Sequence, residues 1–145
     1  MKKFLTALFC GAAIFTSSIC FAAVDGSKIA LGNIFPGMSA EDVTNAFGQP
    51  NRKDGDDWIY KNFTVEIERG AVKEISSRSD TITTPDGVRC GLAAESLNST
   101  FGKADSVEHE RDGVEYKYYS TDRTKKIEFK VTGGVITKIT CELND

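Results

Sequence analysis

Histidine, tryptophan and proline are scarce in this sequence of 145 residues, which holds one histidine, one tryptophan and three prolines. A single histidine excludes a multi-histidine metal site, and no motif around His109 supports a serine–histidine–acid relay. Basic residues are not in excess either, because the formal net charge is −3. Nucleic acids and anionic membranes bind clustered lysine and arginine, so the composition argues against both kinds of partner.

The chain also lacks an apolar run long enough to span a membrane. Its N-terminal stretch from Phe4 to Phe15 is mostly apolar but has only twelve residues, whereas a transmembrane helix needs about 20. Two lysines precede this stretch, and Cys20-Phe21-Ala22 supplies a small-x-small cleavage site after it. This pattern predicts a signal peptide over residues 1–22, so we expect the mature protein to be periplasmic or secreted.

Cysteine is the next scarce residue, and only Cys90 and Cys141 lie beyond the predicted signal peptide. An isolated pair of cysteines in an oxidising compartment most simply forms a disulfide. Cys141 shares the face of a predicted strand with the apolar Val135 and Ile139, which places it inward. The sequence therefore predicts a disulfide between Cys90 and Cys141.

The sequence beyond residue 22 contains one pattern twice. Residues 34–49 return as residues 88–103, at a constant offset of 54 positions. A run of strand-like residues that closes on a glycine follows each copy. A repeated unit of this size usually cannot bury its apolar face alone, so we expect one core shared by two repeats. The predicted domain is 23–145, with repeats at about 29–77 and 83–141.

Each copy begins with a predicted short helix. Gly48 and Gly102 supply the left-handed stops at which these helices end. Ser39 is a good N-cap for the first helix, whereas the second has an alanine at the corresponding position. Phe47 and Phe101 are the last residues before the two stops, and we expect both rings to be buried against a sheet.

Antiparallel strands are predicted after each helix. Residues 63–67 alternate between apolar and polar side chains, which is typical of a strand with one buried and one wet face. The matching strand of the second copy starts at Ile127, 64 positions later, so ten residues are inserted. We place them in loops around 106–112 and 120–125. The prediction is an α+β fold, in which two helix-plus-antiparallel-strand repeats form a joint sheet with the helices on one face.

The starts and ends of the two predicted helices have a recurrent form. It consists of Gly37-Met38-Ser39 with Glu41 and Phe47-Gly48-Gln49-Pro50, and in the second copy of Gly91-Leu92-Ala93 with Glu95 and Phe101-Gly102. This form resembles the repeat shared by β-lactamase-inhibitor proteins and the SmpA-like group of small outer-membrane-assembly lipoproteins. The resemblance implies two α/β units with a joint sheet, and a role in binding protein.

Aromatic residues of the predicted strands are the candidate binding residues. They are Trp58, Tyr60, Tyr116, Tyr118 and Tyr119. Aromatic side chains anchor many protein interfaces, because they bury much area at low entropic cost. They are also ordinary strand residues that pack in cores. The sequence leaves both interpretations open.

No residue set in the chain predicts a catalytic site, a metal site or a cofactor. We therefore expect an exported, non-enzymatic binding module that binds an extracytoplasmic protein, or alternatively a cell-envelope polymer, through its sheet. The alternative is a small cell-envelope enzyme or enzyme inhibitor with a site between the repeats. A cluster of ionisable side chains in a cleft would favour that alternative.

Overall fold

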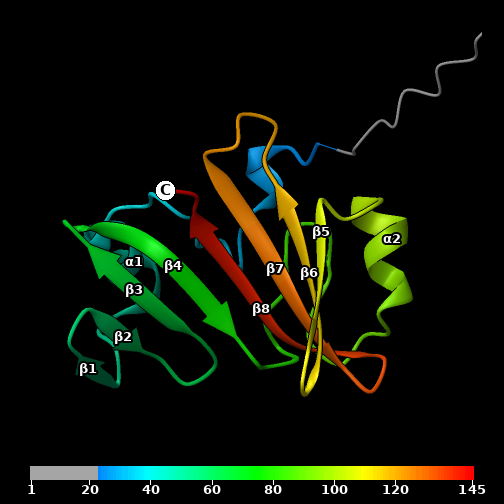
Figure 1. Ribbon diagram of the computed structural model, residues 1–145. Coiled ribbons are helices and arrows are strands. Elements are labelled where there is room, and N and C mark those ends of the chain that lie inside the picture. The colour runs from blue at the N-terminus through cyan, green and yellow to red at the C-terminus, as the bar shows by residue number, and fades with distance from the viewer. Residues whose placement is uncertain (1–22) are drawn as a thin grey trace, which may run out of the picture.

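The computed structural model describes residues 23–145, which form an α+β fold with one eight-stranded antiparallel sheet and two α-helices (Figure 1). The predicted signal peptide lies outside the described residues. In chain order the elements are η1 (Gly26–Lys28), α1 (Ala40–Phe47), β1 (Arg52–Asp54), β2 (Asp57–Ile59), β3 (Thr64–Glu68), β4 (Ala71–Ser77), α2 (Glu95–Phe101), β5 (Ser106–Glu110), β6 (Gly113–Tyr119), β7 (Lys125–Thr132) and β8 (Val135–Leu143). The predicted α+β class is confirmed.

The two helices begin and end as their capping residues dictate. The Oγ atom of Ser39 accepts a hydrogen bond from the backbone N–H of Asp42 over 3.0 Å, which satisfies a free donor of the first turn. Gly48 and Gly102 follow the two helices at φ values of 76° and 74°, a conformation that glycine adopts without steric cost. The N-cap residue of α2 is Ala94, one position after the alanine that corresponds to Ser39, and no side chain caps this helix.

The sheet has the strand order β1-β2-β3-β4-β8-β7-β6-β5. Each helix is thus followed by four consecutive strands, and the two groups join where β4 pairs with β8, with Ile75 opposite Cys141. Similar backbone hydrogen bonds tie the segment before each helix to the last strand of its group. Gly37 donates to Val72 over 2.7 Å, and Gly91 donates to Ile136 over 2.8 Å.

Both helices pack on the same face of the sheet, which we call the covered face. One row of paired residues on this face runs across six strands: Trp58, Val65, Ile75, Cys141, Ile127 and Tyr118. The Phe47 ring of α1 lies 5.2 Å from that of Phe63, and the Phe101 ring of α2 lies 5.3 Å from that of Tyr118. Figure 1 shows α1 behind β3 and β4, and α2 on the β5 side of the sheet.

The centre of the covered face is filled by chain outside the helices and strands. Ile29, Leu31 and Ile34 are almost fully buried, as is Val88 from the segment before α2. All four belong to the same apolar cluster as the inward residues of the strands. The opposite face of the sheet, which we call the open face, carries the polar partners of the alternating strands.

Two details differ from the sequence-based expectation. Residues 106–112 were expected as a loop, but 106–110 form β5, whose mostly charged side chains mask its strand character. Phe47 was expected in the core, yet its side chain is 36% exposed, whereas Phe101 is 4% exposed. Phe47 packs on Tyr60 and Phe63, which keep some exposure themselves, whereas Phe101 packs on Tyr118 and Phe129, which are almost fully buried.

Candidate functional site

Two of the predicted binding aromatics belong to the core. Tyr60 and Tyr118 are 9% and 1% exposed. The Tyr60 ring stacks on Phe63 at 4.6 Å, and the Tyr118 ring lies 6.0 Å from Phe129. Burial raises the pKa of both phenols, that of Tyr118 to about 12. Tyr60 and Tyr118 are therefore core residues and not interface residues.

The other three aromatics are half-buried and lie apart from one another. Trp58 faces the helices from β2, and the Lys53 ammonium group stands 4.0 Å from the centre of its ring. Tyr119 lies on the open face opposite Lys126, with the Arg123 guanidinium 5.1 Å from its ring. Tyr116 faces the helices from β6, opposite Val107 of β5. The structure therefore does not gather the predicted aromatics into one surface.

Tyr116 lines an open groove between α2 and β5. The groove has a volume of about 340 Å³. It is lined by Ala94, Glu95, Leu97, Asn98, Gly102, Lys103, Ala104, Val107, Tyr116 and Tyr118. Val107 forms its outer wall and is 46% exposed, which makes it one of the few large apolar side chains in contact with water. The groove is therefore a mostly apolar hollow at one end of the sheet.

The corresponding place at the other end of the sheet carries a lysine. Lys53 of β1 lies opposite Trp58, as Val107 of β5 lies opposite Tyr116. The Lys53 side chain reaches over the indole ring and brings a charge to that edge. The apolar hollow is consequently a feature of the α2–β5 end.

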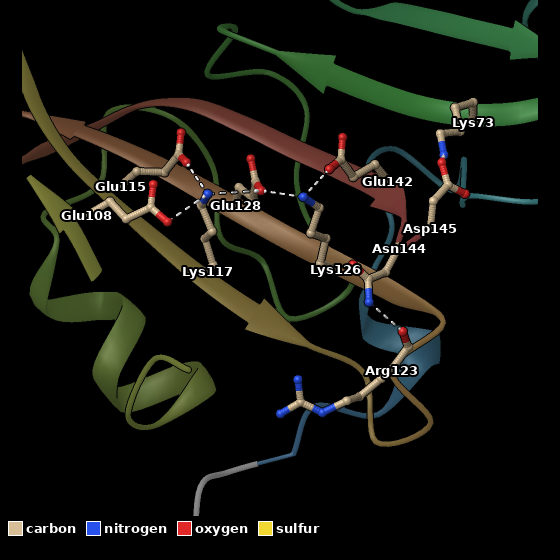
Figure 2. A network of polar contacts seen from close by, with 10 residues as sticks. All are labelled: Lys73, Glu108, Glu115, Lys117, Arg123, Lys126, Glu128, Glu142, Asn144 and Asp145. Atoms are coloured by element: carbon tan, nitrogen blue, oxygen red, sulfur yellow. Dashed lines mark hydrogen bonds and ion pairs between the residues drawn. The ribbon is translucent and has the colours of Figure 1, made fainter. Parts of the chain in front are cut away.

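The open face carries a network of ion pairs. Lys117 contacts Glu108 and Glu115 at 3.1 Å each and Glu128 at 3.8 Å. Lys126 joins Glu128 to Glu142, as Figure 2 shows. Each of these lysines contacts one carboxylate on its own strand and at least one on a neighbouring strand, so the ion pairs link strands β5 to β8.

Negative charge exceeds positive charge in this region. Lys130 forms two further pairs, with Glu110 at 3.0 Å and Asp112 at 2.9 Å. Together, six carboxylates surround three ammonium groups. Burial opposes the charged form of Lys117, but its hydrogen bonds to carboxylates outweigh that effect, so the pKa of Lys117 is raised. The three lysines therefore stay charged and remain paired with these carboxylates.

A second hollow lies on the open face where β4 meets β8. Its volume is about 200 Å³, and Glu74 and Glu142 line it from directly opposite positions. Burial is the main reason that the pKa of Glu74 is raised to about 7. A hydrogen bond with Glu142 adds to the shift, while the charge of Lys138 opposes it. The two carboxyl groups thus favour a state in which they share one proton.

Both cysteines are buried and free, and the predicted disulfide is not formed in the structure. The Sγ atom of Cys90 donates instead to the carbonyl oxygen of Ser77 over 3.6 Å. Ser77 lies opposite Ile139, two residues along β8 from Cys141. Cys90 therefore contacts the sheet at the Ser77–Ile139 pair, whereas Cys141 belongs to the neighbouring pair with Ile75.

Within residues 23–145 there is no group of three or more histidine, cysteine, aspartate or glutamate side chains that could hold a metal ion. His109 is exposed near the end of β5. No helix in this same part of the chain is long and apolar enough to cross a membrane.

Sequence reasoning missed the α2–β5 groove and the ion-pair network. The groove depends on β5, whose single apolar residue Val107 stands among polar neighbours. The ion-pair network could have been predicted from the sequence, because Lys126, Glu128 and Lys130 occupy alternate positions of one strand. Alternating charges of opposite sign on a strand indicate a wet sheet face with cross-strand ion pairs.

No protein-family model matches the chain, and no curated protein matches its sequence. Two solved structures are similar in fold. One is a DUF4309 family protein (YjgB) from Bacillus subtilis subsp. subtilis str. 168, with a TM-score of 0.54, 18% identity and coverage of 72% of this chain and 78% of the other. The second is an extracellular protein containing an SCP domain from Bacillus anthracis str. Ames, with a TM-score of 0.57 and 8% identity.

The match to the Bacillus anthracis protein covers 76% of this chain but only 44% of that longer chain. At these identities the likeness concerns the fold alone. Neither structure bears on the resemblance to β-lactamase-inhibitor proteins or to the SmpA-like group, which stays a prediction.

Proposed function

We propose that this protein is an exported, non-enzymatic binding module that binds an extracytoplasmic protein at the α2–β5 end of its sheet. The observation that carries the proposal is the apolar groove bounded by the exposed Val107. An exposed apolar hollow with a polar rim is a common form of protein-binding site. Tyr116, one of the aromatics predicted to bind, lies in this groove.

The lining of the groove favours binding over catalysis. Apart from its two tyrosines, Glu95 and Lys103 are the ionisable residues in the lining, and no histidine or cysteine lines it. An active site needs several such groups converging on one point. The predicted signal peptide supports export, and one of the two similar structures is described as an extracellular protein.

We also propose that the fold consists of two tandem repeats. The order of helix and four strands occurs twice, and the backbone bonds of Gly37 and Gly91 to the last strand of each group match. Binding at one end then arises from divergence between the copies, since Lys53 in one stands where Val107 stands in the other. The resemblance to protein-binding repeats is consistent with this proposal.

A second candidate is a small cell-envelope enzyme or enzyme inhibitor, with its site at the junction of the repeats. It is favoured by the Glu74–Glu142 pair, which lies between β4 and β8. Two carboxyl groups that share a proton near neutral pH are suited to acid–base catalysis. Turnover of an envelope component that is lost in the variant Glu74→Gln would support this candidate.

The binding proposal is tested by affinity capture of envelope proteins with residues 23–145. Val107→Asp should abolish capture, because it places a charge in the wall of the groove. Phe35→Asp is the control, since Phe35 is also an exposed apolar residue, at 44%, but it precedes α1 and does not line the groove. Equal capture by both variants, or no specific protein captured, would contradict the proposal.

A further inference from the structure

Strand β5 is the outermost strand on its side of the sheet. It pairs with β6 along one edge, from Ser106 opposite Lys117 to Glu110 opposite Gly113. Alternate N–H and C=O groups of an edge strand point away from the sheet and can pair with another extended chain. The backbone of β5 thus offers a template for a further strand.

The two faces of β5 differ sharply in chemistry. Val107 lies on the covered face, directly opposite Tyr116, and forms the wall of the groove. Glu108 and Glu110 lie on the open face, where they pair with Lys117 and Lys130 and keep side-chain exposures of 53% and 39%. His109 shares the covered face with Val107 and lies opposite Val114. A strand added beside β5 would therefore meet Val107, the groove and His109 on one face and carboxylates on the other.

We propose that β5 binds an extended segment of a partner protein in which apolar and basic residues alternate. The apolar side chains would enter the α2–β5 groove next to Val107, and the basic ones would reach Glu108 and Glu110. Strand addition of this kind takes affinity from backbone hydrogen bonds and specificity from pockets for alternate side chains. This inference rests on the proposed function and names the partner's chemistry.

Charge complementarity selects this partner over a second copy of the chain. An antiparallel pairing of two β5 strands would set glutamates of one copy against glutamates of the other. Like charges directly opposite each other destabilise a strand pair. The ion-pair network already has three carboxylates more than ammonium groups, so further negative charge is disfavoured and positive charge is favoured.

The edge at the other end of the sheet does not offer the same site. Strand β1 has three residues, whereas β5 has five. Its residue on the covered face is Lys53, whose ammonium group stands over the Trp58 ring. An incoming apolar side chain would have to displace this charge, which makes β1 the natural negative control.

The test uses residues 23–145 with synthetic peptides of alternating lysine and valine, measured by calorimetry at two salt concentrations. A peptide of alternating glutamate and valine is the charge control. We expect the lysine–valine peptide to bind at least about tenfold more tightly, which corresponds to about 1.4 kcal/mol. Equal binding of the two peptides would overturn the proposal.

Backbone pairing is tested separately with N-methylated peptides. Methyl groups on one set of alternate residues block the hydrogen bonds to β5, while methyl groups on the other set leave them free. We expect the first peptide to lose binding and the second to retain it, and slowed amide exchange should be confined to β5. Equal binding of the two peptides would indicate charge attraction without strand addition and overturn the proposal.

Variants of the protein complete the test. Glu108→Lys combined with Glu110→Lys should reverse the preference in favour of the glutamate–valine peptide, while Glu108→Gln with Glu110→Gln should weaken the lysine–valine peptide without adding repulsion. Capture of the envelope partner should fall in parallel. If the partner is captured equally by all these variants but not by Val107→Asp, strand addition is wrong and the proposed function stands. If no partner is captured by any form, the proposed function itself fails.

Discussion

The hydroxyl group of Tyr118 donates a hydrogen bond of 3.2 Å to the carbonyl oxygen of Gly102, the residue at which α2 ends. Tyr60 makes the same contact with Gly48 at the end of α1, over 3.0 Å. Each bond satisfies a carbonyl group at the C-terminus of a helix, where no intrahelical partner exists. The two tyrosines therefore fix the helix ends to the sheet, a role that requires their burial.

Removing the hydroxyl group of Tyr118 should destabilise the fold. We expect Tyr118→Phe to lower the free energy of unfolding by about 0.5 to 1.5 kcal/mol, the usual net worth of one hydrogen bond. Tyr60→Phe should cost less, because Gly48 is exposed and water can replace the phenol. Urea unfolding of the two variants measures both values, and a larger loss for Tyr60→Phe would contradict this ranking.

The two helix-terminal phenylalanines should differ in their contributions to stability. Phe101→Ala should lower the free energy of unfolding by roughly 3 to 5 kcal/mol, as expected for a buried ring. Phe47→Ala should cost only roughly 1 to 2 kcal/mol, because its partly exposed ring buries less apolar area. Equal losses in thermal or urea unfolding would show that Phe47 is as buried as Phe101.

The helices could be predicted from the sequence because their signals are local. Ser39 and Gly48 mark the ends of α1 within a few residues, whatever the rest of the chain does. The edge strands β1 and β5 could not, because a strand with little apolar contact does not need an alternating apolar pattern. Burial of Phe47 was overestimated, since burial depends on neighbours that are distant in sequence.

The candidate site was predictable only in part. The sequence identifies Tyr116 as a strand aromatic, but it predicts a loop at Val107, the residue of β5 that lies opposite Tyr116. The pairing of β4 with β8, which brings Glu74 next to Glu142, joins residues 68 positions apart. Such long-range pairing depends on the register of the whole sheet, and no local pattern specifies it.

The pH dependence of stability should reveal the carboxyl pair. The pKa of Glu74 is raised from 4.5 to about 7 in the folded protein, so folding takes up a proton between these values. This contribution to stability is complete below about pH 4.5 and is lost as the pH rises through 7. Glutamine at this position does not titrate, so Glu74→Gln should remove this loss. Relative to the wild-type protein, the variant should gain more in melting temperature at pH 8 than at pH 5. Glu41→Gln is the control, because Glu41 is an exposed glutamate of α1. An identical pH profile for both variants would refute the assignment.

The two thiols should react slowly in the folded protein. Burial is the main reason that the pKa values of Cys90 and Cys141 are raised, so the reactive thiolate is disfavoured. We expect iodoacetamide to leave the native protein unmodified and to add two alkyl groups after unfolding without a reductant. Intact mass distinguishes the outcomes, because a disulfide between the two residues would prevent both additions.

Trp58→Ala separates the two roles that the sequence allows for this residue. Trp58 faces the helices from β2 and is half-buried beneath Lys53, at the opposite end of the sheet from the proposed binding groove. We expect the substitution to lower the free energy of unfolding by roughly 2 to 3 kcal/mol, less than for a fully buried ring. Partner capture by the folded fraction should be unchanged, because β5 and α2 are untouched. Capture that is lost while the melting temperature stays constant would instead make Trp58 the centre of the interface and move the binding site to the α1 end.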